Sequence, residues 1–366
     1  MNRSCGLMMS LCLGFLGCSG GSGSGSTPSV AKGIAGSPPE DGTGEGNAGN
    51  SSSLGGSGGA LGPANAAGAA STQSSGSIFE FDLPPGSGPE GIALGPDGNL
   101  WFTEMAASKI GRITPSGAIS EFSLSSTDLK PEAITAGPDG NVWFTESRGN
   151  RIGRITPSGQ ITEFDRLYEE ATPRGIALGS DHHIWFTEWN NGQVLRWSNG
   201  KADEFNIPSG EYSDPRGITA GPDGNLWFTE FGTGNNIGRV TTAGKIDEFP
   251  LPTAGAGAIG IIAGPDGNLW FTESGASQIG RITTAGVVTE FPLASSSDPV
   301  GIAAGSDGNL WFSESEAGRI GRITPSGRVT TFALAPGSEP RGVCAGPDSN
   351  VWFVESGANR VGRIVP

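Results

Sequence analysis

The apolar positions of the chain form short runs that are separated by turn residues. In one unit, residues 91–94 (Gly-Ile-Ala-Leu) precede a Pro-Asp-Gly-Asn turn, and residues 100–104 (Leu-Trp-Phe-Thr-Glu) follow it. A loop leads to residues 110–114 (Ile-Gly-Arg-Ile-Thr), and a Pro-Ser-Gly turn leads to residues 119–122 (Ile-Ser-Glu-Phe). Aromatic and β-branched runs between Gly and Pro turns indicate strands, and Asp-Gly suits a tight hairpin. Each unit therefore predicts four short antiparallel strands.

This unit repeats along most of the chain. Trp-Phe, one further residue and then Glu mark each copy at intervals of 41 to 43 residues, with the tryptophans at Trp101, Trp143, Trp185, Trp227, Trp270, Trp311 and Trp352. A fixed period of this length indicates a repeat architecture, and four strands per period are typical of a propeller blade. The run Leu-Trp-Phe is apolar on both faces of its strand, as a blade packed between two others requires. We predict an all-β fold, a seven-bladed β-propeller of four-stranded antiparallel blades.

The two ends of the repeat region predict how the ring closes. The sequence stops at residues 361–364 (Val-Gly-Arg-Ile), which is the third-strand position of the seventh unit. Residues 78–81 (Ile-Phe-Glu-Phe) precede the first unit and match the fourth-strand pattern of residues 161–164 (Ile-Thr-Glu-Phe). We expect the segment 78–83 to complete the last blade, because this leaves no open sheet edge. The predicted propeller spans residues 78–366.

The segment before the repeats predicts export. Arg3 and the apolar stretch 7–16 are typical of a signal peptide, which we assign to residues 1–18. The segment ends in Phe-Leu-Gly-Cys-Ser, which is similar to a bacterial lipoprotein cleavage box with Cys18 as the lipidated residue. The alternative is an ordinary signal peptide with an incidental cysteine. Residues 19–77 are rich in Gly and Ser, so we expect a disordered tether. We therefore expect a monomer, lipid-anchored in the bacterial cell envelope.

Charge and cysteine content exclude several other classes. The formal net charge is −15, and the repeats alone hold 20 Lys and Arg against 34 Asp and Glu. An acidic domain repels phosphate backbones, so nucleic acid is excluded as a partner. Cys344 is the one cysteine within the repeats, so an internal disulfide cannot stabilise them.

The repeats place two sets of side chains toward one face of the ring, here called the top face. The first strand of each blade runs away from this face and the second returns to it. At the start of the first strands stand Glu90, Glu132, Arg174, Arg216, Ile259, Val300 and Arg341. At the end of the second strands stand Glu104, Glu146, Glu188, Glu230, Glu273, Glu314 and Glu355. We expect both sets to meet near the top of the central channel and to bind a small molecule or a cell-envelope partner there.

Two interpretations of the glutamate set stay open. A residue that recurs in every blade is typical of a structural role, whereas seven carboxylates at one rim could attract a hard divalent cation. As ligand-binding candidates we select Glu90, Glu132, Arg174, Arg216, Glu273 and Glu314. His182 and His183 are the only histidines and replace Gly-Asn in the third Asp-Gly-Asn turn. They are expected on the bottom face, in a solvated turn.

The repeat Pro-x-Gly-Ile-x-x-Gly-Pro-Asp-Gly-Asn-Leu-Trp-Phe-Thr-Glu, with Ile-Gly-Arg-Ile-Thr and Ile-Thr-Glu-Phe, resembles the streptogramin B lyase (virginiamycin B lyase) family. The resemblance covers residues 78–366 and implies a seven-bladed propeller. It also implies a magnesium-dependent elimination that opens the ester of a cyclic depsipeptide antibiotic. In the family, a histidine between Pro and Gly of the last blade is the general base, and a second histidine on the sixth blade contacts the substrate.

When the family's site residues are compared with this sequence position by position, only part of the pattern is present. Glu339 stands before Pro340 at the position of one magnesium ligand, and Glu355 is one residue earlier than the position of the other. The base position is Arg341 and the substrate-histidine position is Val300. The sequence therefore favours a lyase-like propeller that binds a ligand without the family's catalytic histidines. The alternatives are an active magnesium-dependent carbon–oxygen lyase with a different base, a metal-dependent lactonase, and an envelope scaffold without a small-molecule site.

Overall fold

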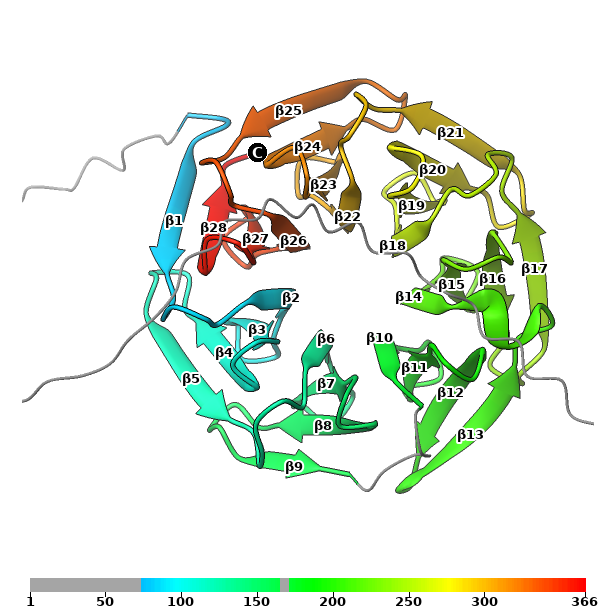
Figure 1. Ribbon diagram of the computed structural model, residues 1–366, viewed down its shortest axis with the longest axis horizontal. Helices are drawn as coiled ribbons and strands as arrows, with labels where there is room; N and C mark the ends of the chain where they lie inside the picture. Colours follow the sequence, from blue (N-terminus) through cyan, green and yellow to red (C-terminus); the bar gives the residue numbers. More distant parts are fainter. Residues whose placement is uncertain (1–73, 165–170) are drawn as a thin grey trace, which may run out of the picture. The chain divides into compact units, whose positions relative to one another are not determined.

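The computed structural model describes residues 74–164 and 171–366 of the chain. These residues form seven four-stranded antiparallel sheets, arranged around a central channel as the blades of a propeller (Figure 1). The predicted all-β, seven-bladed fold is therefore confirmed. The signal segment, Cys18 and the tether up to residue 73 lie outside the described residues. No helix in the described part of the chain is long and apolar enough to cross a membrane.

Each blade is built from four strands that follow one another outward from the channel. The innermost strands are β2 (Pro89–Leu94), β6 (Pro131–Ala136), β10 (Pro173–Leu178), β14 (Pro215–Ala220), β18 (Ala258–Ala263), β22 (Pro299–Ala304) and β26 (Pro340–Ala345). The second strands are β3 (Leu100–Glu104), β7 (Val142–Glu146), β11 (Ile184–Glu188), β15 (Leu226–Glu230), β19 (Leu269–Glu273), β23 (Leu310–Glu314) and β27 (Val351–Glu355).

The outer half of each blade is more exposed. The third strands are β4 (Lys109–Ile113), β8 (Arg151–Ile155), β12 (Gln193–Ser198), β16 (Asn236–Val240), β20 (Gln278–Ile282), β24 (Arg319–Ile323) and β28 (Arg360–Ile364). The outermost strands are β5 (Ile119–Ser123), β9 (Ile161–Glu163), β13 (Lys201–Asn206), β17 (Ile246–Pro250), β21 (Val288–Pro292), β25 (Val329–Ala333) and β1 (Ile78–Asp82). One 3₁₀ turn, η1 (Gly210–Ser213), precedes β14.

Strand β1 closes the ring by pairing with the end of the chain. It is the outermost strand of the seventh blade, where Ile78 lies opposite Ile364 and Asp82 lies opposite Arg360. Arg360 adds hydrogen bonds from its guanidinium to Asp82 at 2.9 Å and to Glu80 at 2.8 Å. The seam is therefore held by both a backbone ladder and charged side chains.

The hydrophobic core lies between neighbouring blades. The second strands are buried along their whole length, and Trp101 of the first blade belongs to the same cluster as Phe144 of the second. Each of the seven repeat tryptophans also donates its indole N–H to the aspartate of the turn before it; for Trp101 and Asp97 the distance is 3.0 Å. This bond explains why the repeat carries Asp at a fixed distance before Trp.

A hydroxyl group bridges neighbouring blades beside the channel. The Thr103 oxygen accepts a hydrogen bond from the N–H of Gly91 in its own blade, at 2.8 Å, and donates one to the carbonyl of Glu132 in the next blade, at 2.9 Å. Equivalent bridges from Thr or Ser join blades two to seven in order. At the seam the position is Val354, so no hydroxyl links the seventh blade to the first.

Each innermost strand also contains a β-bulge beside this bridge. In β2 the pairing with β3 shifts between Pro89 and Ile92, so that Glu90 and Gly91 together oppose Thr103. A Cβ atom on Gly91 would lie 2.5 Å from the carbonyl oxygen of Glu132, so the close approach of β2 and β6 requires glycine there. Bulges redirect side chains, and here the residue before each glycine, or before Ala133 in β6, lines the channel.

Strand β1 closes the ring by pairing with β28. Removing β1 together with Leu83 should therefore expose the edge of β28 and the buried apolar side chains against which Leu83 packs. We predict that a chain starting at Pro84 aggregates or melts at a clearly lower temperature than a matched chain starting at Ser74. Differential scanning calorimetry of the two proteins checks this. Equal melting temperatures would show that the seam strand does not stabilise the ring.

Candidate functional site

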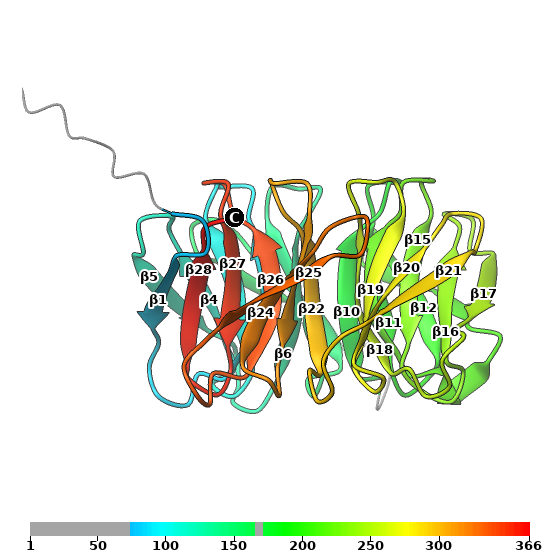
Figure 2. The same ribbon diagram turned by 90° about the horizontal axis from the view of Figure 1, so that it is seen from above.

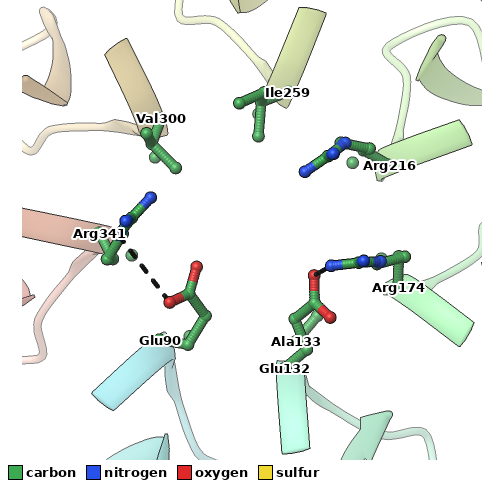
Figure 3. A pocket seen from close by; sticks show the side chains of 14 residues that line it. Glu90, Glu132, Ala133, Arg174, Arg216, Ile259, Val300 and Arg341 are labelled. Atoms are coloured by element: carbon green, nitrogen blue, oxygen red, sulfur yellow. Dashed lines mark hydrogen bonds and ion pairs between the residues drawn. The ribbon is translucent and has the colours of Figure 1, made fainter. Parts of the chain in front are cut away.

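The bulge residues of the seven innermost strands surround one cavity of about 210 Å³ on the channel axis (Figure 3). The residues that enter it are Glu90, Glu132, Arg174, Arg216, Ile259, Val300 and Arg341, with Ala133 and six glycines behind them. The cavity lies at the top face, where the innermost strands begin, and Figure 2 draws this face lowermost. The sequence correctly predicted that these seven positions meet.

The cavity has a charged side and an apolar side. Arg174 pairs with Glu132 at 2.6 Å, and the Nε atom of Arg341 lies 4.0 Å from a carboxylate oxygen of Glu90. Ile259 and Val300 form the opposite wall, as Figure 3 shows. The site therefore offers both charged groups and an apolar surface to one small ligand.

Two aromatic rings hold the arginines in place. The Arg174 guanidinium lies 4.8 Å from the centre of the Trp189 ring, and the Arg216 guanidinium lies 4.0 Å from the centre of the Phe231 ring. We did not predict these rings as part of the site. The sequence does contain a signal for them. An aromatic residue directly follows the second-strand glutamate only in the third and fourth blades, and these are the blades that carry Arg174 and Arg216.

Burial raises the pKa of Glu90 to about 7, and the nearby Glu132 carboxylate acts in the same direction, while Arg341, Arg174 and Arg216 oppose it. Burial and the Arg174 charge lower the pKa of Arg216. Glu90 therefore changes its charge near neutral pH, whereas an arginine stays protonated there. The cavity becomes more positive as the pH falls through about 7.

The glutamates at the ends of the second strands lie elsewhere. Their residues are 0% exposed, or 1% for Glu314, and none of them lines the channel cavity. The reason is strand alternation: Thr103 takes the face beside the bulge, so Glu104 shares the other face with Phe102. The expectation that the two sets meet in the channel is therefore wrong, and Glu273 and Glu314 are buried away from the cavity instead.

The buried glutamates differ in their partners. Glu314 accepts a hydrogen bond from Arg319, and Glu146 accepts one from Arg151 at 2.7 Å. Both carboxylate oxygens of Glu273 lack a hydrogen-bond partner among the described residues. Burial, helped by the Glu290 charge, raises the pKa of Glu273 to about 8. Burial likewise raises the pKa of Glu104, Glu146, Glu188, Glu230 and Glu355 to about 7.

The two residues at the family's magnesium positions have different surroundings. Glu339 lines a second cavity of about 370 Å³ together with Asp298, Glu316 and Arg341. Glu355 is buried, and its charged neighbours Glu80, Asp82 and Arg360 belong to β1 and β28. Among the residues that the structure describes, no three His, Cys, Asp or Glu side chains lie close enough together to hold a metal ion.

The two histidines lie in the turn between β10 and β11, on the bottom face. The His182 N–H donates to the carbonyl of Gly179 at 3.0 Å, and Nδ1 of His183 lies 3.4 Å from Asp181. They line a separate cavity of about 430 Å³ with Trp143, Phe164 and Trp197. Neither histidine lines the channel cavity.

Fold and cavity together define a seven-bladed propeller with a small-molecule-sized channel site. The Virginiamycin B lyase family profile matches residues 63–211 and 197–366. The chain belongs to this family.

Solved structures of high similarity support the assignment. The crystal structure of virginiamycin B lyase from Staphylococcus aureus is 38% identical, covers 79% of this chain and 99% of its own, and has a TM-score of 0.75. A catalytically inactive histidine-to-alanine variant of that enzyme with quinupristin is 37% identical, with the same coverage and TM-score. A virginiamycin B lyase from Bordetella parapertussis is 53% identical over 38 residues, which span 10% of this chain and only 13% of that relative.

The raised pKa of Glu273 gives the fold a pH dependence. A folded-state pKa of about 8 lies above the ordinary value of 4.5, so the folded protein binds this proton more tightly than the unfolded chain. The free energy of unfolding should therefore fall as the pH rises from 5.5 to 8.5. We predict that Glu273→Gln removes about 3 kcal/mol of this fall, measured by chemical denaturation.

The matched control is Glu314→Gln, which removes the partner of Arg319 in the equivalent strand position. This variant should be less stable than the parent protein because it leaves a guanidinium without its carboxylate. An unchanged pH dependence in Glu273→Gln would show that this carboxyl is ionised in the folded protein.

Proposed function

We propose that the protein is an exported, lipid-anchored member of the family that binds a small ligand in the channel and lacks the family's elimination chemistry. The observation that carries this proposal is Arg341 at the position of the general base. A guanidinium keeps its proton at neutral pH and cannot remove one from a substrate. Its Nε atom faces Glu90 at 4.0 Å, as an ion-pairing group would.

The sixth blade supports the same conclusion. Val300 stands at the family's substrate-histidine position and belongs to the apolar wall of the cavity. The S. aureus relative is described as catalytically inactive when one histidine is replaced by alanine. This chain has no histidine in the channel cavity that could take that role.

A second candidate is an active enzyme with another base, either a magnesium-dependent carbon–oxygen lyase or a metal-dependent lactonase. Glu90 favours it, because a carboxyl with a pKa of about 7 inside a cavity is suited to proton transfer near neutral pH. Magnesium would supply electrostatic stabilisation of a developing oxyanion. Glu339 is the one family carboxylate in place, and no described three-residue ligand set accompanies it, so we derive no step through the metal.

The two candidates differ in turnover. We predict that the purified protein with magnesium does not open quinupristin, as followed by liquid chromatography and mass spectrometry, because no residue at the base position can accept a proton. The Arg341→His, Val300→His double variant should gain weak activity. Arg341→Gln with Val300→His is the matched control without a base and should stay inactive. Turnover by the parent protein that disappears in Glu90→Gln would establish the second candidate.

Lipid anchoring can be tested separately. We predict that Cys18→Ser moves the protein from the membrane fraction to the soluble fraction of a bacterial host, because the acyl chains are attached to that sulfur. Cys12→Ser is the matched control and should stay with the membranes. Membrane association that survives Cys18→Ser would contradict a lipid anchor at this residue.

A further inference from the structure

One arginine in the channel cavity has no ion-pair partner among the residues that the structure describes. Arg174 is paired with Glu132, and Arg341 faces Glu90. The Arg216 guanidinium makes no ion pair or hydrogen bond with the residues that the structure describes, and its Nε atom is buried without a partner. Its contact is the Phe231 ring, against which it lies at 4.0 Å. Figure 3 shows its nitrogen atoms directed into the cavity.

The charge balance of the cavity is opposite to that of the protein. Three arginines and two glutamates line it, and burial raises the pKa of Glu90 to about 7. The chain as a whole carries a formal net charge of −15. A partly buried cation without a partner is costly, and an anion that pairs with it removes that cost.

The apolar wall opposite Glu90 and Glu132 determines which chemical group attached to the anion fits the cavity. Ile259 and Val300 present apolar side chains to the same cavity as Arg216, and Val300 is 9% exposed. A volume of about 210 Å³ holds about seven water-sized groups at ~30 Å³ each. A short alkyl chain on a carboxylate fills this space and satisfies both kinds of surface.

We propose that the cavity binds a small monocarboxylate whose charged group pairs with Arg216 and whose apolar chain lies against Ile259 and Val300. This inference rests on the proposed ligand-binding function and names the class of ligand. Arg216 is held by Phe231 in an orientation that leaves its N–H groups free for a two-point contact with a carboxylate. Glu132, Asp214 and Glu90 act on Arg216 electrostatically, and none of these described carboxylates forms an ion pair with it.

The same geometry predicts how pH changes binding. The charged groups around Glu90 are Arg341 on β26, Glu132 on β6, Arg174 on β10 and Arg216 on β14. When Glu90 takes up a proton, the repulsion between its carboxylate and an incoming carboxylate disappears. A free carboxylate ligand stays ionised above pH 6, since its own pKa is about 4 to 5. Binding should therefore strengthen as the pH falls from 8 to 6.

The experiment is isothermal titration calorimetry of the purified protein with pentanoate, pentylamine, pentanol and acetate at low salt. Pentanoate should bind more tightly than the other three, because only it offers both a negative charge and an apolar chain. Arg216→Gln should weaken pentanoate binding about tenfold or more, and Arg216→Lys should restore part of it. Arg148→Gln, at an arginine that is 68% exposed and paired with Asp128, is the matched control and should bind as the parent does.

Glu90→Gln gives an independent readout. It should bind pentanoate at pH 8 as tightly as the parent binds it at pH 6, and its affinity should no longer change between these pH values. Pentanoate affinity that is the same in the parent and in correctly folded Arg216→Gln, judged by circular dichroism, would overturn the inference. Tighter binding of pentylamine or pentanol in the cavity would overturn it and leave the ligand-binding function standing. Quinupristin turnover by the parent would instead refute the proposed function.

Discussion

The hydroxyl bridge between neighbouring blades is the contact that holds the innermost strands around the channel site at six of the seven blade junctions. Each bridge ties the N–H of one innermost strand to a carbonyl of the next, and a glycine permits the close approach in every innermost strand except β6, which has Ala133. The bulge in each innermost strand turns the side chain before this position into the channel. Seven positions therefore decide the chemistry of the cavity while the scaffold stays constant. Only the seam at Val354 lacks the bridge, and there the β1–β28 ladder joins the ends of the chain.

This separation of scaffold and site lets the seven channel positions carry different side chains in blades of the same structure. The hydroxyl bridge does not depend on the side chain at such a position, because Ser313 donates to the backbone carbonyl of Arg341. The fold alone is therefore weak support for an activity. In this chain the channel combines Arg216, which forms no ion pair with the described residues, with an apolar wall.

The fold could be predicted almost completely from the sequence, because each blade repeats the same turn residues and the same buried Trp-Phe strand. The strand-one residues of the site could be predicted for the same reason. The burial of Glu273 was missed, because the end of a strand indicates only how far along the blade a residue lies. Strand alternation puts Glu273 on the face opposite to Thr272, which contacts the bulge. Trp189 and Phe231 were missed because they lie just beyond the strand ends, where only a comparison between blades distinguishes them from other loop residues.

The first and last described residues of the propeller meet on the face opposite the cavity. The N–H of Gly76 donates to the carbonyl of Val365 at 2.8 Å, so these residues lie beside the turns of the bottom face. The channel cavity opens at the other end of the innermost strands. A domain or label joined to either residue would therefore be attached on the side away from the mouth of the cavity.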